Sequence, residues 1–233
     1  MVDLSVEMSE LWTSLGAPAP GRPRLIQVVA ARAGEGASTI ARELALHASR
    51  GGVRSVWLID LDLLAAPQYG AIRADAGRYG ALGPAVAATP DGSVFFTVRP
   101  PAIGEDGKPW PDAAFLAAYR VGATRWWVTR FRREALRAGQ TVHVLTQEDY
   151  WQAMRRHADL VIVDAPSADR SHAAAILAPF MDQTVLVVAA DQTDVRAPAM
   201  LRDAIIEGGG SVAGLFFNRG TVAPPGFLKG LIP

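Results

Sequence analysis

The chain has 233 residues, of which half are hydrophobic and a fifth are charged, a composition typical of a soluble globular protein with one large domain or two small ones. The 23 basic and 23 acidic side chains cancel, so net charge does not favour binding to nucleic acid or to an anionic membrane. Cysteine is absent, which excludes a disulfide framework, a thiol nucleophile and a Cys-ligated metal. All but two of the basic side chains are arginines, and the lysines are Lys108 and Lys229.

Residues 1–24 are predicted to form an N-terminal arm and a linker. Residues 5–15 have apolar side chains near helical spacing, which predicts a short amphipathic helix. These side chains are Val6, Leu11, Trp12 and Leu15. Residues 17–23 are rich in Pro, Gly and Ala, as expected of a linker. The N-terminus lacks a basic leader, and no apolar run approaches the roughly 18–20 residues of a membrane span. We therefore expect a cytoplasmic protein that reaches a membrane only through a partner.

From residue 25 onward, short apolar strands alternate with amphipathic helices. The predicted strands span residues 25–30, 55–59, 160–163, 184–189 and 212–217, and the predicted helices span 38–50, 170–180 and 197–207. This alternation indicates an α/β fold with a mostly parallel central sheet and helices on both faces. We expect residues 25–233 to form a single domain, with an irregular insertion at about 68–152 that adds helices or a hairpin.

The segment AARAGEGASTIA (30–41) follows a predicted strand and opens a helix, which is the context of a phosphate-binding loop. Gly34 and Gly36 permit close approach of the backbone to an anion, and Ser38 stands where such a loop ligates Mg²⁺. Ala37 stands where the loop normally has a lysine that contacts the β- and γ-phosphates. Arg32 is the only cation of the loop, and a guanidinium is not a simple replacement for an ammonium.

Polar side chains end three further predicted strands. Asp60 and Asp62 end the second strand, Asp164 ends the strand at 160–163, and Asn218 ends the last strand. Ligands of an open parallel sheet lie beyond the carboxyl ends of its strands, and carboxylates there suit Mg²⁺. Strand-end acids also serve as helix N-caps, so both interpretations stay open for each acid taken singly.

These motifs resemble those of the cytoplasmic bacterial tyrosine kinases of exopolysaccharide and capsule synthesis, within the MinD/ParA-like P-loop ATPases. The resemblance covers roughly residues 25–66 and 158–220. In that family the loop reads GEGKST, a second acidic motif reads LIDxDxR, and another strand ends in DTPP. The corresponding segments here are 34–39, 58–64 and 164–167, and Asn218 resembles the residue that contacts adenine. The resemblance implies a P-loop NTPase-like domain of the MinD/ParA type.

The sequence departs from the family pattern at four places. Ala37 replaces the catalytic lysine, and Leu64 replaces the arginine of the second acidic motif. The N-terminal ExxRxxR motif would fall near Glu7 and Glu10, where no arginine follows, and the tail at 220–233 has no tyrosine cluster. Together these losses indicate a degenerate member, similar to homologues of holdfast and exopolysaccharide synthesis, that no longer autophosphorylates.

The resemblance and the motifs together define a candidate site. Its nucleotide-binding residues are Arg32, Gly34, Glu35, Gly36, Ala37, Ser38, Thr39 and Asn218, its Mg²⁺ ligands are Ser38, Asp60 and Asp164, and its vestigial acidic motif residues are Asp60, Asp62 and Asp164. Binding of ATP or ADP with Mg²⁺ is expected to be weak or absent. The hypothesis is a non-catalytic or weakly catalytic kinase-like protein that regulates a membrane polysaccharide co-polymerase or export protein by binding, with homo-oligomers also open.

Two other functions stay open. The first is an active ATPase switch of the MinD/ParA type, which dimerises with ATP and uses Arg32 or a partner's cation in place of the lysine. The second is a nucleic-acid-binding module built on residues 124–137, where arginines alternate with Trp126, Trp127 and Phe131. The simpler interpretation of that segment is an amphipathic element whose aromatic side chains pack inward, and with zero net charge no nucleic acid partner is expected.

Overall fold

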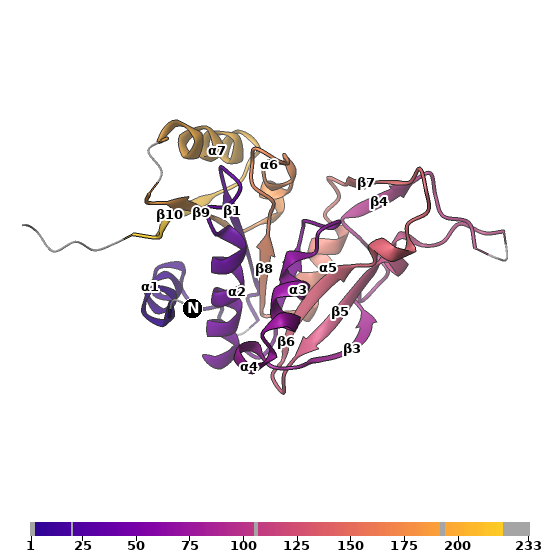
Figure 1. Cartoon of the computed structure of the whole chain (residues 1–233), viewed down its shortest axis with the longest axis horizontal. Helices are drawn as coiled ribbons and strands as arrows, with labels where there is room; N and C mark the ends of the chain where they lie inside the picture. Colours follow the sequence, from indigo (N-terminus) through magenta and orange to yellow (C-terminus); the bar gives the residue numbers. More distant parts are fainter. Residues whose placement is uncertain (1–2, 20, 105–106, 192–193, 221–233) are drawn as a thin grey trace, which may run out of the picture.

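The computed structural model describes residues 3–19, 21–104, 107–191 and 194–220 (Figure 1). The helices are α1 Ser5–Leu15, α2 Ala37–Arg50, α3 Pro67–Ala74, α4 Ala76–Tyr79, α5 Asp149–His157, α6 Ala173–Leu177 and α7 Arg196–Glu207, with 3-10 turns at Asp112–Phe115, Arg133–Ala135 and Ala178–Phe180. The strands are β1 Arg24–Ala30, β2 Val56–Asp60, β3 Leu82–Ala87, β4 Phe96–Arg99, β5 Leu116–Val121, β6 Trp126–Phe131, β7 Thr141–Val144, β8 Leu160–Asp164, β9 Gln183–Ala189 and β10 Val212–Asn218.

The core of the molecule is an eight-stranded sheet with strand order β10-β9-β1-β8-β2-β6-β5-β3. The first six of these strands are parallel, and β5 and β3 complete the sheet as antiparallel neighbours. The central strands β1 and β8 are almost entirely buried, because helices cover both faces of the sheet. The α/β fold with a mostly parallel sheet, predicted from the sequence, is confirmed.

Two hydrophobic clusters, one on each face of the sheet, hold the helices in place. Helices α1 and α2 pack on one face, where Leu15 and Leu44 are buried against the even-numbered side chains of β1. Helices α5, α6 and α7 pack on the other face through residues such as Trp151 and Leu201. Successive side chains of β1 point to opposite faces of the sheet, so they are buried alternately in the two clusters.

The N-terminal helix has the predicted span, and three of the four predicted apolar side chains, Leu11, Trp12 and Leu15, pack against the core. Val6 is 68% exposed, whereas Met8 is buried against α2 together with Leu15. Met8, Leu11, Trp12 and Leu15 follow the i, i+3, i+4, i+7 spacing of one helix face, and Val6 lies outside that face. The predicted helix at 170–180 is shorter, since α6 covers only Ala173–Leu177 and a 3-10 turn follows.

The predicted insertion is largely part of the central sheet. Strand β6 pairs in parallel with β2, and the β5–β6 hairpin then adds β5 and β3 at the edge. Only β4 and β7 form a separate two-stranded sheet. Trp126 and Phe131 of β6 are buried, and Trp127 stacks on Trp57 with ring centroids 5.6 Å apart. The aromatic side chains of residues 124–137 thus pack inward, in a strand and a 3-10 turn.

None of the helices in the described ranges is both long enough and apolar enough to span a membrane.

If the aromatic side chains of this segment are structural, substitutions of its aromatic residues and of its arginines will differ strongly in their effect on stability. Phe131 is 2% exposed and packs against Phe96 and Phe115, so Phe131→Ala is expected to lower the free energy of unfolding by about 3–5 kcal/mol. Arg125 is exposed, and Arg125→Ala is expected to change it by about 0.5 kcal/mol or less. Urea denaturation measures both; equal effects would contradict this assignment.

Candidate functional site

The candidate residues meet at the carboxyl ends of β1, β2 and β8. The loop between β1 and α2 crosses the end of β1, and Asp60 and Asp164 end their strands as register partners across β2 and β8. Their side chains are 3% and 2% exposed. The parallel register therefore places two carboxylates side by side in a buried position, which is costly unless each is bonded or protonated.

Gln68, in the first turn of α3, bridges the two carboxylates. Its backbone N–H donates to Asp60 Oδ2 at 2.9 Å, so Asp60 satisfies one of the free amides at the start of this helix. Its side-chain Nε2 donates to Asp164 Oδ2 at 2.6 Å and to the carbonyl of Ser38 at 2.8 Å. Arg42 of α2 holds the amide in this orientation, because its guanidinium donates to Gln68 Oε1 at 3.0 Å.

Three of the four carboxylate oxygens are bonded within the protein. The remaining oxygen of Asp60 accepts the N–H of Asp62 at 3.0 Å. The other oxygen of Asp164, Oδ1, is buried and has no hydrogen-bond partner among the described residues. An unpartnered buried carboxylate oxygen favours a proton on the pair.

Burial also raises the pKa values of this pair. It raises the pKa of Asp164 to about 6, although the amide of Gln68 and the nearby Ser38 hydroxyl act in the opposite direction. The pKa of Asp60 lies well above its usual value, first because of burial and second because of the charge of Asp164. Both carboxylates therefore keep a proton to higher pH than an exposed aspartate does.

Acidic side chains bond two amides of the loop itself. Glu35 is buried, and its carboxylate accepts the N–H of Arg32 at 2.8 Å and that of Ala189 at 3.4 Å. Asp169 accepts the N–H of Ala33 at 3.1 Å. These amides are therefore not available to a bound phosphate.

The start of α2 keeps amides that can face an anion. The helix begins at Ala37 after Gly36, whose φ of 98° lies in the left-handed region. In the described part of the chain, the N–H groups of Gly36, Ala37 and Ser38 donate no hydrogen bond, while the N–H of Thr39 bonds to the carbonyl of Gly36. Asn218 lies over this turn and donates to the carbonyl of Glu35 at 2.8 Å.

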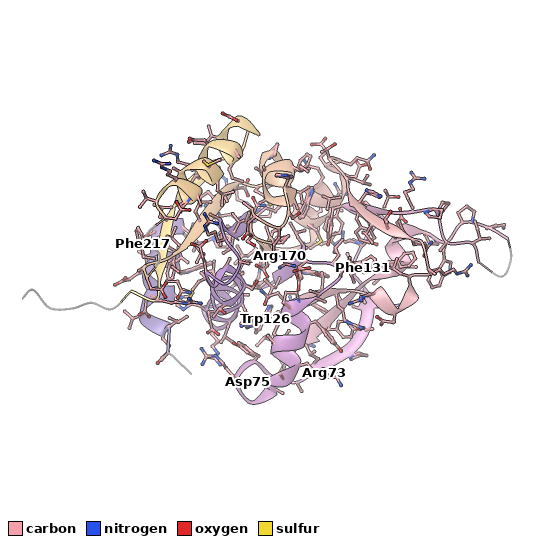
Figure 2. The ribbon with its side chains drawn as sticks, turned by 45° about the horizontal axis from the view of Figure 1, so that its top comes forward. Arg73, Asp75, Trp126, Phe131, Arg170 and Phe217 are labelled. Carbon is pink, nitrogen blue, oxygen red and sulfur yellow. The ribbon has the colours of Figure 1, made fainter. Side chains whose placement is uncertain are left out.

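The arginines around the loop are already bonded to other groups of the protein. Arg32, the proposed replacement for the lysine, forms an ion pair with Asp194. Arg219 contacts the carbonyl of Gly34 at 2.5 Å. Asp62 pairs with Arg170 at 2.9 Å and takes no part in the bridge (Figure 2 labels Arg170).

Sequence reasoning did not identify Gln68 and Arg42 as site residues. Neither residue lies in a recognisable motif, and Gln68 reaches the acids only because α3 begins directly beside Asp60. The one sequence signal was position, because Gln68 follows the second acidic motif and Arg42 follows the phosphate loop, and this is not specific.

The acid pair fits a proton better than Mg²⁺. The carboxylates of Asp60 and Asp164 are buried and face the amide of Gln68, whereas a bound Mg²⁺ usually keeps several waters. The free amides at the start of α2, by contrast, are compatible with a phosphate group.

Comparison with solved structures shows where this fold occurs. The kinase domain of the Escherichia coli tyrosine kinase ETK matches with a TM-score of 0.53 and 14% identity over 93% of this chain and 76% of that chain. The cell division ATPase MinD from Pyrococcus furiosus matches with a TM-score of 0.52 and 15% identity over 86% and 74%. A nucleotide-binding protein from Archaeoglobus fulgidus, in complex with ADP, gives 0.51 and 15% over 92% and 71%.

At these identities the likeness shows the fold alone. The chain has the α/β fold of bacterial tyrosine kinase domains and MinD ATPases, as the sequence motifs implied. A scan against protein-family models found no match, and a search of curated proteins found none either.

The buried pair makes stability depend on pH. Because the folded-state pKa of Asp164, about 6, exceeds the usual value of 3.8, its protonated form stabilises the fold below about pH 4, and this contribution is lost as the pH rises through 6. We expect Asp164→Asn, which cannot ionise, to gain about 3 kcal/mol of unfolding free energy relative to the wild type between pH 4 and pH 7.

Urea denaturation at a series of pH values measures this gain. Asp203→Asn, on the exposed surface of α7, changes no buried carboxylate and is the matched control. A difference between Asp164→Asn and the wild type that stays constant with pH would contradict the assignment.

Proposed function

We propose that this protein acts by binding and not by phosphoryl transfer, as a non-catalytic relative of the P-loop kinases. The observation that carries this proposal is the bridge from Asp60 through Gln68 to Asp164. In a working site these acids would hold Mg²⁺ or its water. Here Asp60 accepts the backbone N–H groups of Asp62 and Gln68, and Asp164 accepts the side-chain amide of Gln68. These hydrogen bonds stabilise the acids as part of the structure, and burial raises the pKa of both carboxyl groups.

The loop supports the same proposal. Ala37 offers no ammonium to a β- or γ-phosphate, and this removes the contact that stabilises charge in the transition state. Glu35 and Asp169 place negative charge on the loop, where it repels a phosphate. The free amides at the start of α2 retain weak binding of ATP or ADP, without a need for Mg²⁺.

The proposed partner is a membrane polysaccharide co-polymerase or export protein of exopolysaccharide synthesis. This part of the proposal rests on the resemblance of residues 25–66 and 158–220 to the kinases of that process, and on the fold shared with the tyrosine kinase ETK domain. The protein would control its partner through occupancy of a binding surface, which requires the fold but no turnover.

Calorimetric titration with ATP tests the loss of catalysis. We expect weak binding with the same affinity in the presence and absence of Mg²⁺, and no release of phosphate, because Asp60 and Asp164 are not free to ligate the metal. Ser38→Ala removes the remaining hydroxyl ligand and is expected to leave the affinity in Mg²⁺ unchanged. Tight Mg²⁺-dependent binding with measurable turnover would overturn the proposal.

Sedimentation with membranes tests the proposed partner. In cells that contain the co-polymerase we expect the protein in the membrane fraction, and without the co-polymerase we expect it in the supernatant. Ser38→Ala is expected to sediment like the wild type, since association requires no catalysis. Identical distributions in both kinds of cell would contradict the proposed partner. Loss of membrane association in Ser38→Ala would contradict the claim that association does not depend on the loop.

A further inference from the structure

A cavity of about 750 Å³ lies between α3 and the end of β6. We call it the arginine pocket, because Arg73 of α3, Arg130 of β6 and Arg133 of the following 3-10 turn line it together with Leu64 and Tyr69. Figure 2 labels two residues that line this pocket, Arg73 and Phe131, and Phe131 is the last residue of β6. A volume of this size matches sites for small molecules.

Two of the three guanidinium groups are uncompensated. Arg130 pairs with Glu134 through two contacts of 2.9 Å. Arg73 and Arg133 are exposed, and neither forms an ion pair or a side-chain hydrogen bond with any described residue. The pocket therefore holds three positive charges against a single carboxylate, in a chain whose total charge is zero.

Aromatic contacts hold the wall of the pocket in place. The guanidinium of Arg130 lies over the ring of Tyr69, 5.0 Å from its centroid, and the rings of Tyr69 and Tyr119 are 4.7 Å apart. These contacts fix the position of the Arg130 guanidinium before any ligand binds, which reduces the conformational entropy lost on binding. Leu64, 51% exposed, adds an apolar side chain to the same wall.

The pocket is separate from the site at the carboxyl ends of β1 and β8. Gln68 and Tyr69 are adjacent on α3, but Gln68 faces Asp60 and Asp164, whereas Tyr69 lines the arginine pocket. No residue of the acid bridge or of the loop lines the pocket. Binding in the pocket therefore does not depend on the proposed function.

We propose that the arginine pocket binds a small organic phosphate, a phosphate monoester or a diphosphate. Guanidinium groups bind phosphate oxygens through paired hydrogen bonds, and Arg73 and Arg133 are free to form them. The exposed side chain of Leu64 and the ring of Tyr69 provide an apolar surface for the organic part of the ligand. A nucleoside diphosphate and a sugar phosphate share this chemistry.

Calorimetric titration of the full chain with pyrophosphate tests the pocket. We expect binding that weakens with added salt, and about a tenfold loss of affinity in each of Arg73→Gln and Arg133→Gln, because each removes a charge-assisted contact. Both side chains are exposed and unpaired among the described residues, so both variants are expected to melt within a few degrees of the wild type. Arg125→Gln, an exposed arginine outside the pocket, is the matched control and should bind as the wild type does.

Three results would overturn the proposal. They are the absence of pyrophosphate binding at low salt, equal affinity in the wild type and the Arg73→Gln/Arg133→Gln double variant, and an equal loss in Arg125→Gln. Parallel titrations with ADP and with a sugar 1-phosphate distinguish the two sources, since the preferred one binds more tightly than pyrophosphate. Binding of an acidic peptide in place of all three phosphates would assign the pocket to a protein partner and reject the proposal.

Discussion

The structure depends on how two buried carboxylates are accommodated at the ends of β2 and β8. The parallel register aligns Asp60 with Asp164, and burial at 3% and 2% exposure removes the water that would otherwise solvate them. Gln68 supplies a backbone donor to one and a side-chain donor to the other, and Arg42 orients its amide. This network connects α2, α3, β2 and β8. The hydrogen bonds of the two acids therefore also hold α2 and α3 at the carboxyl ends of the central strands.

The same network limits the chemistry of the phosphate loop. A nucleotide site of this fold requires positive charge on the loop and free carboxylates beside it. Here the loop has Ala37 at the lysine position, Arg32 is paired with Asp194, and Glu35 bonds the loop from within. The backbone geometry for an anion persists at the start of α2, whereas the side chains that would act on the anion are absent or engaged. Under the proposed function, the fold is kept without the catalytic chemistry that it supports in other proteins.

The hairpin of β5 and β6 shows how one segment can serve both packing and binding. Side chains alternate across a strand, so Trp126 and Val128 enter one cluster while Trp127 stacks on Trp57 toward the opposite face. At the end of β6 the chain turns, and Arg130 and Arg133 enter the wall of a pocket with Arg73. The mixture of arginine and aromatic residues thus reflects a buried strand that ends at a charged surface.

The sequence by itself determined the fold class, the alternation of strands and helices in residues 25–59 and 160–217, and the position of the phosphate loop. These follow from local periodicity, from glycine at a left-handed turn and from acids at strand ends, all of which are encoded within a few neighbouring residues. It also showed the missing lysine at Ala37.

Only the tertiary structure decided the rest. The addition of β6 beside β2, the bridge formed by Gln68 and the gathering of Arg73 with Arg130 all join residues that are distant in sequence or lack a motif. Each depends on which elements pack together, and packing minimises exposed apolar area and unpaired polar groups over the whole chain. No local pattern contains that information.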